Sequence, residues 1–365
     1  MKKTQVALAA LALVASTAAL ADGVTIYGAV DAAVAHSNGG KGTYLDGTGS
    51  WTAPTHLGFK GGESLGNGMK ASFQLETGVS LGNGAAVSGG NGGATANANG
   101  FGALFTRVAT VGLSGDFGAV NIGQQLSPFI VPNVVGAGAG MGPGSFFVNR
   151  MILSGYGAAA VNVAGSTSFN YDGFFIPNSI QYTSPSLNGW TVNAMTTTKA
   201  GAKDGTVSTS TDTDSYQAYT LGGAVGSIGL MAGYQTRKNV NSSYTLAATM
   251  PLSSDLTLAA SYISNDETKG YGSGYKIGST SVFFNYRLSD ALSAQLGYAR
   301  NDLSTEQTLT SVSMKYDLSK RTFTYASYGR GTGGADASFA NRGGFSFNAG
   351  ADATTNFAVG VGHSF

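Results

Sequence analysis

The chain has 365 residues, and its 20 Lys and Arg against 19 Asp and Glu leave a formal net charge of +1. This balance leaves no basic surplus for binding nucleic acid, and charged residues reach only 11%, against about 25% in an ordinary soluble domain. The chain contains no Cys, so disulfide bonds cannot stabilise it.

The N-terminal segment has the pattern of a secretory signal peptide. Two early Lys residues precede an apolar run over 6–14, and the segment ends in Ala-Leu-Ala at Ala21. The run is shorter than the roughly 20 apolar residues that a membrane-spanning helix needs. We therefore expect cleavage after residue 21, with 22–365 forming a single domain.

After the signal peptide, apolar and polar residues alternate along short segments, which is typical of strands. In 69–79, Met69 and Phe73 lie on one face, whereas Lys70 and Glu76 lie on the other. The second face carries many small and polar residues, which suits a crowded or water-filled lumen. The same alternation occurs in 243–250 and 281–288.

Short turns divide the strands into hairpins. Seven segments have the Gly, Asn, Asp and Ser content of tight turns, and longer Gly-, Ser- and Asn-rich segments lie between them. Short turns at one end and long loops at the other are typical of outer-membrane barrels. Seven turns connect eight hairpins, so the sequence predicts an all-β fold, a transmembrane antiparallel β-barrel of 16 strands. The turns are 64–68, 115–118, 185–189, 225–229, 252–255, 288–291 and 318–321; the longer segments include 37–53, 81–100, 200–213, 265–275 and 331–351.

One connection is much longer than a surface loop needs. The segment 127–176 follows a strand expected around 120–125, and it contains apolar residues such as Phe146, Phe147 and Ile152. Compact loops of this length are usually functional or disordered, and this one is too apolar for a disordered tail. We expect this third loop to fold into the lumen and narrow the pore. A barrel of 16 to 18 strands leaves an aqueous channel to be narrowed.

Several motifs together resemble the Gram-negative general diffusion porins, especially their beta-proteobacterial branch. They are "GVTIYGAVDAAV" (23–34), "THLGFKGGESLGNGMKASFQLETG" (55–78), "TRVATVGLSGDFGAVNIGQQLSP" (106–128), "NSIQYTSPSLNGW" (178–190) and the final strand ending in Phe. The resemblance implies a homotrimeric channel in the outer membrane. Such a channel would pass ions and small hydrophilic solutes passively.

The resemblance also implies a ladder of basic residues on the barrel wall, facing carboxylates of the third loop. Two of three expected wall arginines are replaced here, by His56 and Gln124, and the third is kept as Arg107. Guanidinium groups stay charged, whereas histidine side chains are largely neutral at pH 7. We therefore expect a weakly selective pore. The residues expected at the constriction and lumen are Asp31, His56, Lys60, Lys70, Glu76, Arg107, Gln124, Arg150 and Asp172, with any residual preference set by Lys60, Lys70 and Arg107 against Asp31, Glu76 and Asp172.

The last strand, 354–365, alternates as well, with Phe357 and Phe365 on its apolar face. To leave no open edge in lipid, it must hydrogen-bond back to 24–34 and close the barrel. The resemblance adds that the outer-membrane assembly machinery recognises a terminal Phe strand. Phe365 is therefore expected to serve in closure and as an assembly signal.

Other functions receive less support from the sequence. An enzyme needs a nucleophile or activated water beside a base, and the chain has three His with no catalytic constellation around His56. No cofactor or metal site is indicated, because the acids of 211–214 and 265–267 fit solvated loops. Basic residues near the outer strand ends could bind lipopolysaccharide phosphates beside the membrane lipid. A substrate-specific channel and a structural or adhesive barrel remain alternatives.

Overall fold

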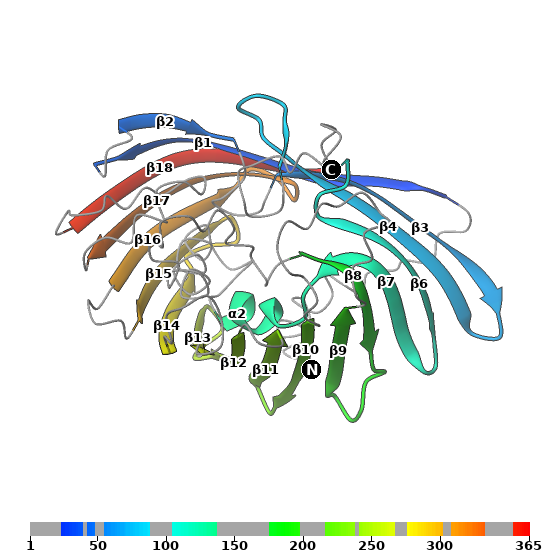
Figure 1. Cartoon of the computed structure of the whole chain (residues 1–365). Coiled ribbons are helices and arrows are strands. Elements are labelled where there is room, and N and C mark those ends of the chain that lie inside the picture. The colour runs from blue at the N-terminus through cyan, green and yellow to red at the C-terminus, as the bar shows by residue number, and fades with distance from the viewer. Residues whose placement is uncertain are drawn as a thin grey trace, which may run out of the picture.

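The computed structural model describes residues 23–38, 42–47, 55–87, 104–136, 175–197, 216–237, 241–266, 276–301, 308–332 and 353–365. These residues form one antiparallel sheet and one short helix (Figure 1). The predicted signal peptide, 1–21, lies outside the described residues. The long strands are β1 (Thr25–Ser37), β3 (His56–Gly66), β4 (Met69–Val79), β6 (Val108–Gly115), β7 (Gly118–Leu126), β8 (Phe175–Thr183), β9 (Thr191–Thr197), β10 (Tyr216–Val225), β11 (Ile228–Arg237), β12 (Asn241–Pro251), β13 (Leu256–Asp266), β14 (Lys276–Arg287), β15 (Leu292–Asn301), β16 (Thr308–Asp317), β17 (Thr322–Thr332) and β18 (Ala353–Ser364).

The sheet closes on itself. The first half of β1 pairs with β3, and its second half pairs with β18, so the first and last strands lie side by side (Figure 1). Each other long strand pairs with its two neighbours along the chain. The predicted closed antiparallel barrel of 16 strands is therefore confirmed. Two short strands extend it where loops were expected: β2 (Gly42–Asp46) pairs with the end of β1, and β5 (Ala86–Val87) pairs with β4.

All seven predicted turns join consecutive strands. Between β3 and β4, Asn67 and Gly68 have φ values of 52° and 75°, as the favoured two-residue hairpin turn requires. The last three turns share a Leu-Ser start, and in each the Ser hydroxyl accepts a hydrogen bond from the backbone N–H three residues later. These serines are Ser253, Ser289 and Ser319, with distances of 3.1, 3.0 and 3.0 Å. Turn chemistry encoded in the sequence thus determines the hairpins.

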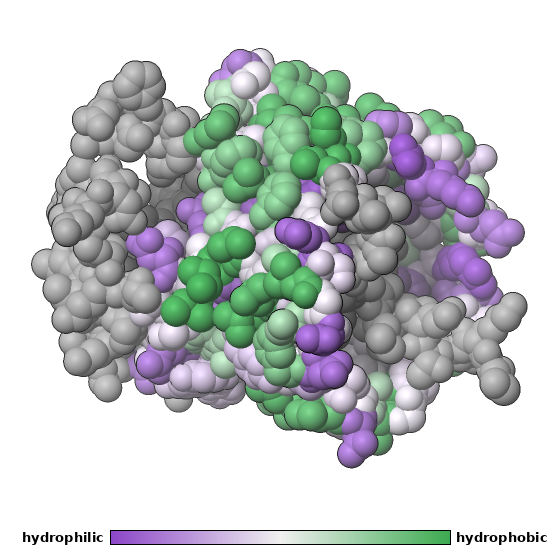
Figure 2. All heavy atoms as spheres, turned by 90° about the vertical axis from the view of Figure 1, so that its right-hand side faces the viewer, coloured by the Kyte–Doolittle hydropathy of each residue, from purple (hydrophilic) through white to green (hydrophobic). Residues whose placement is uncertain are grey.

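The two faces of the barrel wall differ as the alternation predicts. On β12, Tyr244 and Leu246 are 43% and 55% exposed and point outward, whereas Thr245 and Ala247 are buried and point inward. Large hydrophobic residues form patches on the outside of the molecule (Figure 2). An apolar outer face of this kind suits contact with lipid. No helix among the described residues is long and apolar enough to span a membrane.

The chain leaves β7 through an irregularity that redirects it. The register of β7 against β8 shifts between Gly123 and Gln125, which marks a β-bulge. Gly123 has a φ of 131°, a backbone conformation that residues other than Gly rarely adopt. Just beyond, the hydroxyl of Ser127 hydrogen-bonds to that of Tyr216 at 2.6 Å, and Tyr216 donates to Gln235 Oε1 at 2.8 Å. This buried network attaches the end of β7 to β10 and β11.

The helix α2 (Ile130–Gly136) then packs on the inner faces of β12 and β13, and it lies inside the arc of strands in Figure 1. A Cβ added at Gly136 would lie 2.4 Å from Ser261 Cβ and 2.9 Å from Ala247 Cβ. The start of the predicted third loop therefore crosses from β7 to a distant part of the wall. The segment 137–174 lies outside the described residues, so folding of the whole loop into the lumen stays a prediction.

Candidate functional site

A group of polar side chains lies on the inner faces of β1, β3 and β4 and at the start of β6. We call Tyr27, His56, Lys60, Gln74, Glu76 and Arg107 the charged cluster. Strand register brings them together, because Gly58 of β3 is opposite both Tyr27 of β1 and Glu76 of β4. A Cβ at Gly58 would lie 2.3 Å from Tyr27 Cζ. The missing side chain thus allows Tyr27 to reach across β3.

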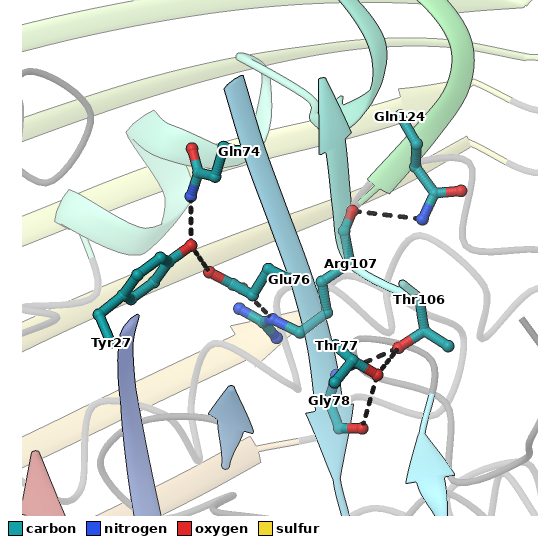
Figure 3. A network of polar contacts seen from close by, with 8 residues as sticks. All are labelled: Tyr27, Gln74, Glu76, Thr77, Gly78, Thr106, Arg107 and Gln124. Atoms are coloured by element: carbon teal, nitrogen blue, oxygen red, sulfur yellow. Dashed lines mark hydrogen bonds and ion pairs between the residues drawn. The ribbon is translucent and has the colours of Figure 1, made fainter. Parts of the chain in front are cut away.

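Tyr27 and Arg107 both hold the carboxylate of Glu76 (Figure 3). The Tyr27 hydroxyl donates to Glu76 Oε2 at 2.9 Å, and Gln74 Nε2 donates to the Tyr27 hydroxyl at 2.7 Å. The Arg107 guanidinium donates through Nε to Glu76 Oε1 in an ion pair. The side chains of Arg107 and Glu76 are 13% and 8% exposed, so solvent screens this pair less than a surface pair.

Lys60, Arg107 and His56 of the charged cluster also contact aromatic rings. Lys60 Nζ lies 5.1 Å from the centroid of the Tyr27 ring, and Arg107 Cζ lies 4.7 Å from that of Phe175. Both distances fall in the range of cation–π attraction. The His56 ring meets the Tyr27 ring edge-on, with centroids 6.0 Å apart. The Lys60 and Arg107 cations and the Glu76 carboxylate together give the cluster one net positive charge.

The structure separates some predicted site residues from the charged cluster. Lys70 lies on the inner face near the short turn, six residues from Glu76 on β4, which corresponds to about 20 Å along a strand. Asp31 is 1% exposed and accepts a hydrogen bond from the Tyr325 hydroxyl at 2.6 Å, so it faces β17. Gln124 donates to the backbone oxygen of Arg107 at 3.3 Å and supports the backbone beside the cluster. Arg150 and Asp172 lie outside the described residues.

Sequence reasoning missed Tyr27 as a member of the cluster. Its position in the alternating segment gives it the same inward face as Asp31, so parity along the first strand could have identified it. Gln74 lies two residues before Glu76, so the alternation in 69–79 puts it on the same face, but nothing in the sequence gives it a role. Within the described ranges, no three His, Cys, Asp or Glu side chains are grouped so that they could hold a metal ion.

At the seam of the barrel, Phe365 closes the last strand onto the first. Its backbone N–H donates to Gly28 O at 3.1 Å, and Gly28 N–H donates to Phe365 O at 3.2 Å. The Phe365 ring covers Gly28, where an added Cβ would lie 2.6 Å from ring atom Cζ. These contacts join the end of β18 to β1, whereas the role of Phe365 as an assembly signal stays a prediction.

The family profile described as Gram-negative porin matches residues 7–336. The chain belongs to the Gram-negative porin family. This porin is 42% identical over 132 residues to outer membrane porin protein 32 of Delftia acidovorans, covering 35% of this chain and 33% of that protein. It is 37% identical over 134 residues to major outer membrane protein P.IB of Neisseria gonorrhoeae, covering 35% and 33%. The chain thus spans about a third of the length of these curated relatives.

Solved structures extend the comparison over the whole barrel. The porin aligns with the anion-selective porin from Comamonas acidovorans at a TM-score of 0.71 and 24% identity, covering 94% of this chain and 99% of that one. At this identity the likeness supports the fold alone. Family membership places the porin in the outer membrane of a Gram-negative bacterium.

Proposed function

We propose that this porin forms a water-filled, weakly ion-selective channel for the passive diffusion of ions and small hydrophilic solutes. The main observation in support of weak selectivity is the ion pair between Arg107 and Glu76 on the inner wall. It compensates the charge of Arg107, the one expected wall arginine that is present, so the charged cluster presents little net charge to a passing ion. Sixteen strands support an open lumen rather than one filled by side chains.

The third loop, 127–176, narrows this lumen. Its first residues leave β7 through the bulge at Gly123 and cross to β12 and β13, which supports an inward course for the rest. Arg150 and Asp172, the only Lys, Arg, Asp or Glu residues in the sequence of the loop, would then face the barrel wall. The outer-membrane assembly machinery recognises the strand that ends at Phe365, and the mature chain, 22–365, assembles as a homotrimer in lipid and lipopolysaccharide. It has no catalytic activity.

Single-channel recording of the purified porin in planar bilayers tests this function. A general diffusion channel gives large current steps that are ohmic and increase in proportion to the bulk salt concentration. A substrate-specific channel would instead show small steps with saturable block by one class of solute. Absence of any current from folded protein would contradict the proposal and would favour the structural or adhesive alternative.

A further inference from the structure

The seam of the barrel joins the two ends of the chain, because β18 pairs there with β1 (Figure 1). The pairing runs from Ala29 opposite Ser364 to Ser37 opposite Asn356. Closure therefore requires one register between segments that lie far apart in the sequence. Alternation rejects a shift by one residue, because such a shift would turn the apolar face of a strand toward the lumen.

Alternation does not reject a shift by two residues. Such a shift exchanges one outward residue of β18 for the next, and these residues are all apolar. It likewise exchanges one inward residue for another that is also small. The outward residues are Phe357, Val359 and Val361, and the inward residues are Ala358, Gly360 and Gly362. The register of the closed barrel therefore needs a determinant other than the alternation.

Two glycines of β18 lie beneath aromatic rings of β17. Gly360 is directly opposite Tyr325, and Gly362 is directly opposite Phe323. A Cβ added at either glycine would overlap the ring opposite it. A shift of β18 by two residues would bring Ala358 under the Tyr325 ring in one direction, or Ser364 under the Phe323 ring in the other. The two glycines thus hold β18 in one register against β17.

The side chain of Tyr325 continues past β18 and reaches β1. Its hydroxyl donates a hydrogen bond to Asp31 Oδ1 at 2.6 Å, between residues that are 294 positions apart. Tyr325 is 3% exposed and Asp31 is 1% exposed, so the bond is buried in the wall. The inward residues on either side of Asp31 are Ala29 and Ala33, whose side chains cannot accept a hydrogen bond. A shift of β1 by two residues would therefore break this bond.

The same arrangement occurs on the other side of β1. In the charged cluster, Tyr27 crosses Gly58 of β3 and donates to Glu76 of β4 at 2.9 Å. In both places a Tyr lies over a Gly of the adjacent strand and binds an acidic side chain of the strand beyond it. The two bridges together connect β17, β18, β1, β3 and β4. A side-chain bridge across a glycine is thus used twice around the seam.

We propose that Tyr325, Gly360 and Asp31 form a register key, which selects a single alignment of β17, β18 and β1 when the barrel closes. The glycine allows the Tyr325 ring to lie across β18, and the hydroxyl then aligns β1 with both strands. This role goes beyond the proposed channel function, because it concerns how the barrel forms and not what passes through it.

Disulfide trapping measures the register, because the chain contains no Cys of its own. Val34 lies directly opposite Val359, and both are exposed on the outer face. Cα atoms of opposite residues are about 5.5 Å apart or closer, which permits a disulfide, whereas Cα atoms more than about 7 Å apart do not. The pair Val34→Cys, Val359→Cys therefore reports the native register. Val34→Cys with either Val361→Cys or Phe357→Cys reports a shift by two residues in one direction or the other.

Each pair is introduced into the full-length porin, which is unfolded in urea, refolded in detergent micelles and oxidised. The measured quantity is the ratio of shifted to native cross-linked protein on a non-reducing gel. Tyr325→Phe removes the hydroxyl and keeps the ring over Gly360, so this ratio should rise by about fivefold to tenfold, as expected for one buried hydrogen bond.

Tyr328→Phe is the matched control, because it removes a hydroxyl from the same strand but from a side chain that points outward and is 45% exposed. Its ratio should stay within about twofold of the parent. A ratio in Tyr325→Phe that is no higher than in Tyr328→Phe would overturn the register key. If Tyr325→Phe does not refold, Asp31→Ala removes the acceptor of the same bond, and an unchanged ratio there counts against the key.

A second background makes the comparison more sensitive. The Phe365 ring covers Gly28 on the outer face, at the end of the same seam, so Phe365→Ala should make shifted chains more frequent in every protein. The difference between Tyr325→Phe and Tyr328→Phe should persist in that background, and equal ratios in both backgrounds would overturn the register key.

Bilayer recording of the same preparations separates this inference from the proposed function. A parent porin that conducts, together with equal ratios in the two Tyr variants, refutes the register key alone. A parent porin that cross-links in the native register but passes no current refutes the proposed function, and a raised ratio in Tyr325→Phe would still support the key.

Discussion

Replacing Glu76 by Gln should make the pore more selective for anions. The substitution keeps the shape of the side chain and an oxygen that can accept from Tyr27, but it removes the charge that compensates Arg107. Lys60 and Arg107 then give the charged cluster two net positive charges instead of one. Because the cluster lies on the inner wall, a permeating ion senses this change directly.

The size of the effect follows from Coulomb's law. For an ion passing about 10 Å from the carboxylate in water, removing one charge changes the energy by roughly 0.4 kcal/mol. At 0.1 M salt, screening over one Debye length lowers this to about 0.15 kcal/mol. The change has opposite signs for a cation and an anion, so the anion-to-cation permeability ratio should rise by roughly two- to fourfold.

The assay is the zero-current potential across a bilayer under a potassium chloride gradient, measured at low and high mean salt. The shift caused by Glu76→Gln should shrink at 1 M salt, where the Debye length is about 3 Å. Glu63→Gln is the matched control, because Glu63 carries the same charge but is exposed near the short turn between β3 and β4. An unchanged permeability ratio in Glu76→Gln, or an equal shift in Glu63→Gln, would refute the role assigned to the cluster.

Three further predictions concern the frame around the pore. Gly58→Ala should lower the thermal unfolding midpoint and reduce folded yield, because its Cβ would meet Tyr27 Cζ at 2.3 Å; a normal midpoint would contradict the packing described. Deleting Phe365 should reduce assembled protein in outer membranes more than it alters the conductance of pores that form, and normal yield would exclude an assembly role. Hydrogen bonds from Arg287 hold the pKa of Asp255 below its ordinary value. These hydrogen bonds therefore stabilise the folded protein when the pH is above the ordinary pKa of Asp, and this stabilisation is lost as the pH falls through the lowered pKa. The small difference in unfolding midpoint between the parent and Asp255→Asn should therefore shrink as the pH falls below about 3.9, the ordinary pKa of an Asp carboxyl, and a difference that stays constant as the pH is lowered would contradict this sign.

The sequence predicts the barrel well because its signals are local. Turn residues such as Asn67 and Gly68, and the Leu-Ser starts of the last three turns, determine where strands end. Period-two alternation then assigns each side chain to a face. The helix at Ile130–Gly136 lacks such a signal: it spans seven residues, includes Pro132 and is rich in Val, so its conformation depends on packing against β12 and β13.

The sequence predicts which side chains of the candidate site point toward the lumen better than it predicts which of them lie next to one another. Alternation placed Lys60, Lys70 and Glu76 toward the lumen, but only the register of β3 against β4 shows that Lys60, opposite Gln74, lies nearer to Glu76 than to Lys70. Tyr27 reaches Glu76 because Gly58, between them, has no side chain. That arrangement depends on three distant segments, and no local pattern encodes it.

The zero-current potential of the unaltered porin at neutral pH tests the central claim most directly. Under a tenfold potassium chloride gradient, a perfectly selective pore would approach about 59 mV in magnitude. A weakly selective, water-filled channel with one net positive charge in its cluster should give a small potential, a minor fraction of that limit, on the anion-preferring side. A potential near the limit, of either sign, would contradict the account.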